Sequence, residues 1–340
     1  MARTSLAVKY RPRTFDDLTE QSAIKDILEE QIKTKTFQHA YLFTGPAGTG
    51  KTTSARIFAD MINQNKGNPI EVDAASNSGV DNIRHIIDDS KKKALDAEYK
   101  IYIIDECHSL SSGAWQAMLK LLEEPPKYSI FILCTTDPQK IPATIMSRVQ
   151  RYQFNKISNS GIEDRLHTIL HNELEVGGEV HPEAVSYIAK IANGGMRDAI
   201  TMMDKCLSLS NHLTLDNVLK VVGSEDYSTF FKLLKGLCSR DLTCIEIIDN
   251  VFADGKDIKQ FMKEFSKFIL DCQKYAIFKN MDYLTIPATN EMEEELKSLD
   301  SDSTFSVMRT IMDINNQIKY DADPKTLVQM GLVLYCKEGV

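Results

Sequence analysis

The chain has 340 residues, a formal net charge of −8 and 43% hydrophobic residues. This length and composition indicate a globular protein of two or three domains and exclude general disorder. No apolar run reaches the roughly 18 residues that a membrane span requires, and Met1–Ser5 lack the apolar stretch of a secretory signal. We therefore expect no contact with a membrane.

Net charge and cysteine content bear on nucleic-acid binding, on zinc and disulfides, and on cellular location. A protein that binds DNA by bulk electrostatics is usually basic, so nucleic-acid contact by this acidic chain would need a local basic face or partner chains. None of the seven cysteines forms a Cys-x-x-Cys pair, which argues against a zinc cage and a disulfide framework. Scattered thiols favour a reducing, cytoplasmic location.

Between about Leu6 and Phe154, short apolar runs alternate with amphipathic segments. This pattern is typical of a parallel sheet covered by helices. The expected strands are Ala40–Phe43, Ile70–Asp73, Lys100–Ile104, Ser129–Cys134 and Gln150–Phe154. The expected helices are Ala23–Thr34, Thr52–Asn63, Val80–Ala94, Ser112–Glu123, which consecutive prolines end, and Pro142–Ser147.

From Ser158 onward the strand signals disappear. Three helices with short joints are expected at Ile162–Leu174, Pro182–Asn193 and Met196–Leu209. The remaining chain also reads as helical, over Leu215–Val222, Tyr227–Cys238, Leu242–Ala253, Ile258–Phe278, Glu291–Leu299, Phe305–Asp323 and Pro324–Cys336. The predicted layout is an α/β domain over residues 1–156, a three-helix lid over 157–210 and an all-helical domain over 211–340.

The segment after the first strand fits a phosphate-binding P-loop at every required position. It consists of Gly45, Pro46, Ala47, Gly48, Thr49, Gly50, Lys51 and Thr52. Glycines let successive N–H groups point at phosphate oxygens, and the following helix adds positive potential at its N-terminus. Lys51 is expected to reach the β- and γ-phosphates, Thr52 to ligate Mg²⁺ and Thr53 to line the nucleotide site. A chance glycine-rich turn is the alternative, but the strand–loop–helix context favours a nucleoside triphosphate site.

Two carboxylates follow the strand at Lys100–Ile104. In a sheet of this kind the carboxyl ends of the strands face the ligand crevice. Asp105 is expected to hold Mg²⁺ through water, and Glu106 to act as general base on the attacking water. An acidic pair at a strand exit can also be incidental, but the P-loop upstream favours the functional interpretation.

Further candidates lie farther along the chain. Thr135 and Thr136 end another strand, and the sequence alone does not decide which hydroxyl senses the γ-phosphate or merely caps a turn. Arg148 either supplies a cation to the transferring phosphoryl group or is an ordinary surface residue. Arg197 begins a lid helix, where it either bends over the phosphates or pairs with Asp198 or solvent.

Several sequence segments resemble those of AAA+ clamp-loader subunits, most closely the bacterial gamma/tau subunits of DNA polymerase III. They are Val8–Pro12, Thr14–Leu18, Glu20–Gln21, Glu71–Asn77, Leu119–Pro126 and Thr135–Pro142. The resemblance covers roughly residues 5–210, whereas the last third matches only in length and helical character. It implies that Arg11 contacts the nucleotide, that Thr136 and Arg197 are the two sensors, and that Arg148 acts in trans on ATP held by a neighbouring subunit.

The resemblance also implies a function. It predicts an ATPase that opens the sliding clamp and loads it onto primed DNA, with delta-type and delta-prime-type subunits, copies of itself, the clamp and DNA as partners. Its cofactors are ATP and Mg²⁺, and its helical last domain serves as an oligomerisation collar. Two alternatives remain: another AAA+ ATPase acting on nucleic acid in recombination or fork remodelling, and a non-hydrolysing structural subunit, which has no need of the intact Lys51, Thr52, Asp105 and Glu106.

Three departures from the family pattern qualify these expectations. The stretch Met61–Pro69 contains no cysteine where the family usually carries a four-cysteine zinc module, so zinc is predicted to be absent. Val149 replaces the cysteine that commonly follows Arg148. The chain ends after the presumed collar, which suggests a short, gamma-type subunit without the tau extension.

The resemblance also names candidate DNA contacts. Arg84 and Lys120 lie on helices that face the central channel in the family, so they are the candidate phosphate contacts here. Asn77 and Gly79 replace residues that are often basic in the family. Lysines and arginines on amphipathic helices are often merely solvated, so a surface role for both residues is the alternative.

Overall fold

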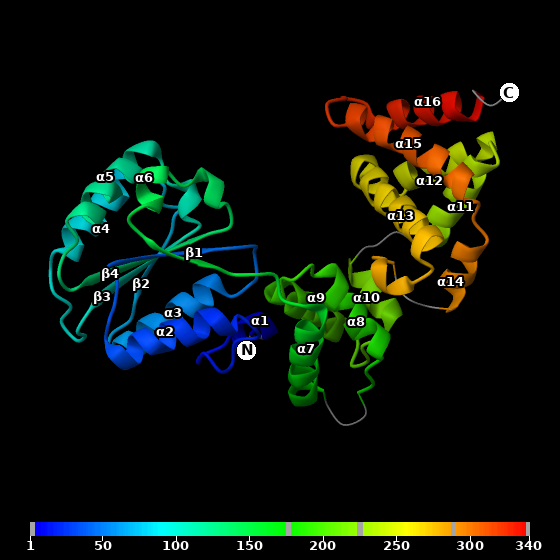
Figure 1. The fold of residues 1–340 in the computed structure, drawn as a ribbon. Coiled ribbons are helices and arrows are strands. Elements are labelled where there is room, and N and C mark those ends of the chain that lie inside the picture. Colours follow the sequence, from blue (N-terminus) through cyan, green and yellow to red (C-terminus); the bar gives the residue numbers. More distant parts are fainter. Residues whose placement is uncertain (1–3, 175–177, 223–226, 287–289, 338–340) are drawn as a thin grey trace. The chain divides into compact units, whose positions relative to one another are not determined.

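The computed structural model describes residues 4–174, 178–222, 227–286 and 290–337. The chain divides into two compact units, residues 1–213 and 214–340 (Figure 1). The prediction that Met1–Ser5 is not a secretory signal falls partly outside the described residues, because these exclude Met1–Arg3. Among the residues that are described, no helix combines the length and apolar character needed to cross a membrane.

The first unit is built around a five-stranded sheet in which every pair of neighbouring strands is parallel. The strands lie in the order β2-β3-β4-β1-β5. Their bounds are β1 Ala40–Thr44, β2 Ile70–Asp73, β3 Lys100–Asp105, β4 Ser129–Thr135 and β5 Gln150–Gln153. The predicted five-stranded parallel sheet is therefore confirmed, and each strand end lies within one residue of its predicted position.

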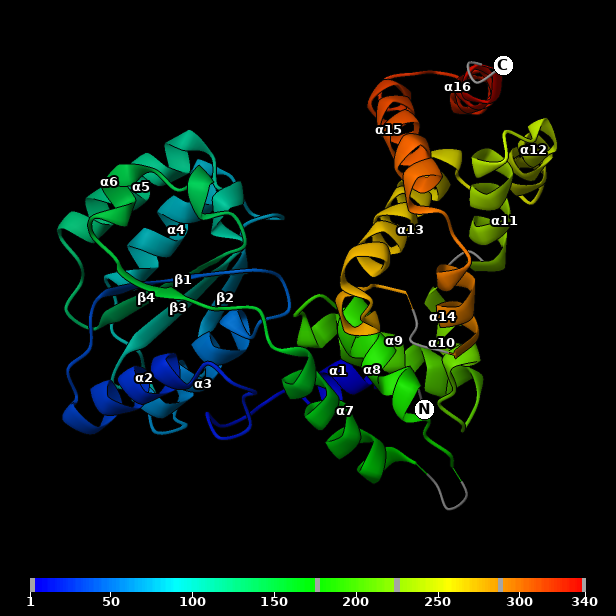
Figure 2. The ribbon, with the colours of Figure 1, turned by 45° about the vertical axis from the view of Figure 1, so that its right-hand side comes forward.

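Helices cover both faces of this sheet (Figures 1 and 2). One face packs against α2 (Ser22–Thr34) and α3 (Lys51–Ile62), and the other against α4 (Val80–Ser90), α5 (Ser112–Glu123) and α6 (Ala143–Met146). Because side chains alternate along a strand, residues such as Tyr41 and Phe43 enter the first core and Leu42 enters the second. β1, β3 and β4 are apolar at nearly every position because both of their faces are buried.

Three helices complete the first unit after the sheet. They are α7 (Asn159–Glu173), α8 (Pro182–Ile191) and α9 (Met196–Leu209), as expected for the lid. The short helix α1 (Leu6–Lys9) packs against α9, where the Leu6 N–H donates a hydrogen bond to Asp204 Oδ2 at 2.9 Å. The N-terminal segment of the chain is thereby anchored to the lid.

The second unit is helical throughout its described residues. Its helices are α10 (Leu215–Val222), α11 (Tyr227–Cys238), α12 (Ile245–Ala253), α13 (Ile258–Phe278), α14 (Asn290–Lys297), α15 (Ser301–Ile318) and α16 (Pro324–Lys337). Its core contains a cluster of phenylalanines centred on Phe230, whose ring centroid lies 5.3–5.6 Å from those of Phe261, Phe265 and Phe268. The expectation of an all-helical C-terminal region is confirmed.

Several predicted helix bounds are wrong, and the largest differences fall in α4, α15 and α12. α4 ends at Ser90 rather than Ala94, because the Ser90 carbonyl accepts a hydrogen bond from the Ser129 hydroxyl of β4 at 2.6 Å. α15 begins four residues early, where the Asp300 side chain caps the Ser303 N–H at 2.8 Å, and ends at Ile318. The segment from Leu242 starts as a 3₁₀ turn, η3 (Leu242–Cys244), before α12. In two of these cases a side chain competes for the terminal backbone groups of the helix.

Candidate functional site

The segment Gly45–Thr52 forms the loop between β1 and α3, and its backbone requires its glycines. Gly48 and Gly50 adopt φ values of +72° and +98°, a region that residues with a Cβ rarely enter. A Cβ on Gly45 would lie 2.4 Å from the Phe154 carbonyl oxygen, and one on Gly48 would lie 3.0 Å from the Cα of Gly195. The loop is thus pressed between β5 and the start of the third lid helix.

Lys51 lies beneath this loop and is buried. Its Nζ donates hydrogen bonds to the carbonyl oxygens of Gly45 at 2.8 Å and Pro46 at 2.7 Å. Burial lowers the pKa of Lys51 below its ordinary value, and an anion beside the ammonium group would favour the charged form. The loop thus holds a cation where a phosphate group is expected.

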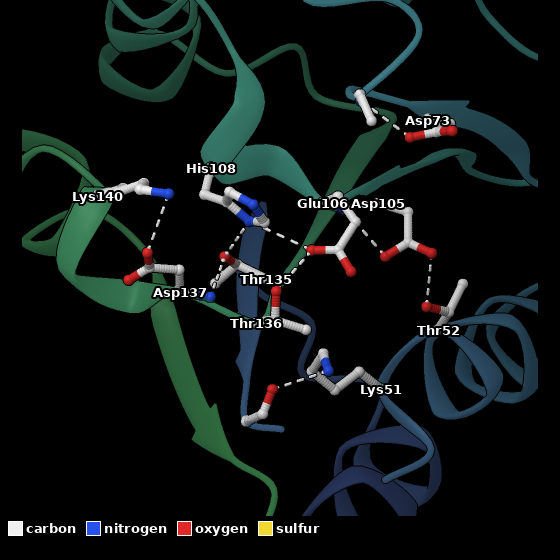
Figure 3. A network of polar contacts seen from close by, with 12 residues as sticks. Lys51, Thr52, Asp73, Asp105, Glu106, His108, Thr135, Thr136, Asp137 and Lys140 are labelled. Atoms are coloured by element: carbon white, nitrogen blue, oxygen red, sulfur yellow. Dashed lines mark hydrogen bonds and ion pairs between the residues drawn. The ribbon is translucent and has the colours of Figure 1, made fainter. Parts of the chain in front are cut away.

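Thr52 and Asp105 meet at the mouth of the loop. The Thr52 hydroxyl donates to Asp105 Oδ2 at 2.8 Å (Figure 3). A hydroxyl and a carboxylate are the hard oxygen ligands that Mg²⁺ prefers, usually together with phosphate oxygens. These residues therefore fit a magnesium ion held between protein and triphosphate. Within the described residues, no group of three or more His, Cys, Asp or Glu is arranged to hold a metal ion.

Glu106 belongs to a network that reaches β4 (Figure 3). Its Oε2 accepts a hydrogen bond from the Thr136 hydroxyl at 3.0 Å and lies 3.2 Å from His108 Nδ1. His108 Nδ1 also lies 3.0 Å from the Thr135 hydroxyl, which accepts the Asp137 N–H at 3.0 Å. The two threonines that the sequence leaves unresolved thus have different partners: Thr136 contacts Glu106, whereas Thr135 contacts His108.

A cavity of about 400 Å³ opens over the loop. Most of the predicted nucleotide-site residues line it, namely Arg11, Ala47, Gly48, Thr49, Gly50, Lys51, Thr52, Thr53, Asp105, Glu106 and Arg197. The lid closes one side of the cavity, because the Met196 N–H donates to the Gly48 carbonyl at 3.0 Å. Gly45, Pro46, Thr136 and Arg148 are not among the described residues that line the cavity.

Arg148 lies elsewhere on the first unit. Its guanidinium donates to Glu123 Oε1 at 2.9 Å and to the Thr144 carbonyl at 2.7 Å, and its side chain is 34% exposed. These contacts hold Arg148 against α5 and α6. The residue thus lies outside the cavity of its own chain.

The two candidate DNA contacts line a second hollow, between α4 and α5. This basic groove has a volume of about 930 Å³ and is lined by Arg84 and Lys120, together with four further lysines, Lys91, Lys92, Lys93 and Lys127. Glu124 is its one carboxylate among the described lining residues. Arg84 pairs with Asp81 at 3.1 Å and Lys91 pairs with Asp88 at 2.8 Å, and the remaining lysines leave a local basic face on a chain whose formal net charge is −8.

Sequence reasoning missed several residues at these sites. In the groove, the run Lys91–Lys93 was a visible signal. In the nucleotide cavity, Arg165 on α7 and Tyr10 both line the wall, and Arg165 donates to the Tyr10 carbonyl at 3.1 Å. Burial first, then the hydrogen bond to Glu173, raises the pKa of Tyr10 to about 12. Arg165 carried no signal in the sequence, since only the fold brings α7 to the cavity.

Two family models match the first unit. The model described as "DNA polymerase III, delta subunit" matches residues 20–78 and 62–158. The model described as "DNA polymerase III clamp loader subunit, ATPase lid domain" matches residues 161–212. The second match falls on the three helices α7–α9, of which α7 and α9 contribute residues to the cavity wall.

Curated relatives match most of the chain. It is 34% identical to DNA polymerase III subunit tau of Bacillus subtilis, over 99% of this chain and 64% of that protein. It is 30% identical to DNA polymerase III subunit gamma of Buchnera aphidicola, over 89% of this chain and 88% of that protein. The chain thus spans less than two thirds of the length of the Bacillus relative and most of the length of the Buchnera one.

A solved structure is similar in fold. The RuvB Holliday junction branch migration motor of Thermotoga maritima aligns with 67% of this chain and 79% of its own, with a TM-score of 0.51 and 20% identity. At that identity the similarity concerns the fold alone.

Proposed function

The chain belongs to the gamma/tau family of DNA polymerase III clamp-loader subunits, and from this premise we propose that it binds and hydrolyses ATP at subunit interfaces to load a sliding clamp onto primed DNA. The observation that carries the proposal is the meeting of Lys51, Thr52, Asp105 and Glu106 at one cavity. A scaffold that only held partners would not need a buried lysine, a paired hydroxyl and carboxylate, and a second carboxylate at a single site.

ATP and Mg²⁺ are the cofactors of this proposal. The N–H groups of Ala47–Thr52 and the ammonium group of Lys51 bind the phosphates, and Thr52 and Asp105 hold Mg²⁺. When bound, the ion neutralises charge that develops on the phosphate oxygens. Arg11 and Thr53 line the same cavity and complete the nucleotide contacts.

Glu106 accepts the proton of the attacking water as general base. Its carboxylate lies at the cavity wall and is held by the Thr136 hydroxyl at 3.0 Å. Thr136 therefore links the general base to the end of β4. This contact supports its role as the first sensor of the nucleotide.

Arg197 supports a second sensor role. It lies on the cavity wall at the start of α9, next to Met196, whose N–H bonds the P-loop carbonyl of Gly48. A change in the phosphates would pull directly on the N-terminus of this helix. The angle of the lid can thereby report the state of the nucleotide.

The position of Arg148 supports an active site that is complete only when subunits assemble. Since it is held against α5 and α6, outside the cavity of its own chain, we assign it to ATP bound by a neighbouring subunit. A cation supplied in this way is worth about 10³–10⁵ in rate. Hydrolysis then depends on assembly.

The partners we propose are delta-type and delta-prime-type subunits, further copies of this chain, the sliding clamp and primed DNA. Arg84 and Lys120 contact DNA phosphates from the basic groove. We retain the division into residues 1–156, 157–210 and 211–340 as ATPase domain, lid and oligomerisation collar. A cytoplasmic location and the absence of zinc likewise remain predictions.

The decisive experiment is an ATPase assay of the chain alone, then with delta-type partners, then with clamp and primed DNA. Stimulation that requires both clamp and primed DNA is the expected result. Stimulation by DNA without a clamp would instead favour another AAA+ activity on nucleic acid. No hydrolysis under any condition would leave only a structural role.

A further inference from the structure

We propose that His108 is a positioning residue for ATP hydrolysis, which orients the carboxylate of Glu106 through its ring Nδ1. The inference rests on the proposed function, because it concerns the general base of that reaction. His108 lies in η1 (Cys107–Ser109), the 3₁₀ turn directly after Glu106. Its ring contacts Glu106 and Thr135 and does not line the cavity among the described residues, so it acts through Glu106.

The backbone of Glu106 makes such support necessary. Glu106 adopts φ +46° and ψ +43°, the left-handed conformation that non-glycine residues rarely enter. Conformations of this kind persist at functional sites when the surroundings over-determine them. The Glu106 side chain is 37% exposed, so packing alone leaves the carboxylate free to rotate. Hydrogen bonds must therefore fix its orientation.

Two groups meet the same carboxylate oxygen. The Thr136 hydroxyl donates to Glu106 Oε2 at 3.0 Å, and His108 Nδ1 lies 3.2 Å from that oxygen. An ionised carboxylate has only acceptors, so this contact is favourable only when Nδ1 carries a proton. The Thr135 hydroxyl, 3.0 Å from the same Nδ1, can accept a hydrogen bond from the protonated nitrogen or donate one to the unprotonated nitrogen, so the choice of tautomer rests on the Glu106 carboxylate. The surroundings therefore select the Nδ1-protonated ring.

The other carboxylate oxygen stays open. In the described parts of the chain, no hydrogen bond to Glu106 Oε1 is found, while Oε2 has both contacts. Pinning Oε2 leaves Oε1 as the oxygen that can accept a proton from water. Glu106 also lines the nucleotide cavity. Correct orientation of a catalytic group is a large part of its effect, because misplacement by about 1 Å can cost 10²-fold in rate.

His108 is itself well held. Its side chain is only 18% exposed, and Thr135 is fully buried at the end of β4. Thr135 also accepts the Asp137 N–H, which ties the ring to the turn after β4. The His108 ring, held in this way, connects the end of β4 to Glu106, the residue that directly follows β3.

The test compares His108→Ala and His108→Asn with the unchanged chain in the assembled complex, using Mg·ATP. An asparagine Nδ2 can occupy the place of the histidine Nδ1 and donate to the same oxygen. We expect His108→Ala to lower kcat about 10-fold or more with little change in KM, as loss of orientation without loss of binding predicts. His108→Asn should recover most of that loss. His167→Ala, on an exposed residue of α7, is the matched control and should behave as the unchanged chain.

A double variant separates positioning from a merely structural role. If His108 acts through the Glu106 carboxylate, His108→Ala should have no further effect on the residual rate of Glu106→Gln. Additive losses, an unchanged kcat in His108→Ala, or a kcat raised by that variant would each overturn the inference. Failure of the unchanged complex to hydrolyse ATP would instead overturn the proposed function, and the inference with it.

Discussion

At the scale of single residues, the strongest prediction concerns the role of Lys51 in binding Mg·ATP. Its ammonium group is buried and bonded to two carbonyl oxygens of the P-loop. Lys51→Ala removes that charge and leaves both carbonyls without their donor. A charge-assisted hydrogen bond contributes about 1.5–3 kcal/mol, so loss of contacts to two phosphates should weaken Mg·ATP binding at least about 100-fold. Isothermal titration calorimetry measures this.

The control for Lys51 is Lys66→Ala, which removes an exposed lysine just beyond α3. It should leave the affinity unchanged. Equal affinity of Lys51→Ala and the unchanged chain for Mg·ATP would show that the P-loop assignment is wrong.

From the position of Arg148 we predict that its substitution slows ATP hydrolysis without changing ATP binding. Because its guanidinium lies outside its own cavity, Arg148→Ala should bind Mg·ATP normally but slow hydrolysis by about 10³-fold in the assembled complex. Arg151→Ala, an exposed arginine on the edge strand β5, serves as the control. A normal rate in the Arg148 variant would refute the assignment.

Mixing variants tests whether Arg148 acts in trans. Chains with Lys51→Ala lack an ATP site but keep Arg148, whereas chains with Arg148→Ala keep the ATP site. Co-assembled, the two form some interfaces with every required group, so the mixture should regain activity that neither variant has alone. If Arg148 acted on ATP bound by its own chain, the mixture would show no such recovery.

At the scale of elements, α13 is held to the segment after η4 (Met281–Tyr283) by one buried carboxylate. Asp271 is 1% exposed and accepts the N–H groups of Thr285 at 2.6 Å and Ile286 at 3.2 Å. Asp271→Ala removes the acceptor of the buried Ile286 N–H and of the Thr285 N–H, so we expect the free energy of unfolding of the second unit to fall by about 3 kcal/mol. Asp254→Ala, an exposed position after α12, should have little effect.

The single tryptophan allows this loss to be assigned to one unit. Trp115 is buried in α5 of the first unit. In urea, Asp271→Ala should shift the loss of helical circular dichroism to lower concentration while the Trp115 fluorescence transition stays in place. An unshifted circular dichroism transition would contradict the role of Asp271. A fluorescence transition that shifted equally would show that the two units unfold together.

How much of the fold and of the candidate site the sequence predicts depends on whether the interactions join neighbours in the chain or residues far apart in it. The strands of the first unit are predicted because β1, β3 and β4 are apolar on both faces, a local property. The P-loop is predicted because its glycines and Lys51 lie side by side in the chain. The end of α4 is missed because it depends on a hydroxyl of β4, Ser129. Arg165 is missed for the same reason, since only the folded chain brings it to Tyr10. His108 stands two residues after Glu106 in the chain, but only the fold places its ring between Glu106 and Thr135 of β4.

At the scale of the whole molecule, charge decides how DNA can be bound. The formal net charge of −8 opposes binding by bulk attraction, so we propose that the basic groove between α4 and α5 supplies phosphate contacts locally. Binding that releases counterions weakens with salt, with a slope of about 0.9 per phosphate contact on a double-logarithmic plot.

The double variant Arg84→Ala/Lys120→Ala should therefore bind primed DNA more weakly, and the salt slope for the assembled complex should fall by about 2 for each chain that contacts DNA. Lys33→Ala/Lys35→Ala also removes two positive charges, but from exposed positions at the end of α2, which covers the opposite face of the sheet. If binding depended on net charge, both double variants would lose the same affinity. If it depends on the groove, fluorescence anisotropy at several salt concentrations will show a changed slope only in the first. An unchanged slope in both would exclude Arg84 and Lys120 as phosphate contacts and leave DNA binding to the partner chains.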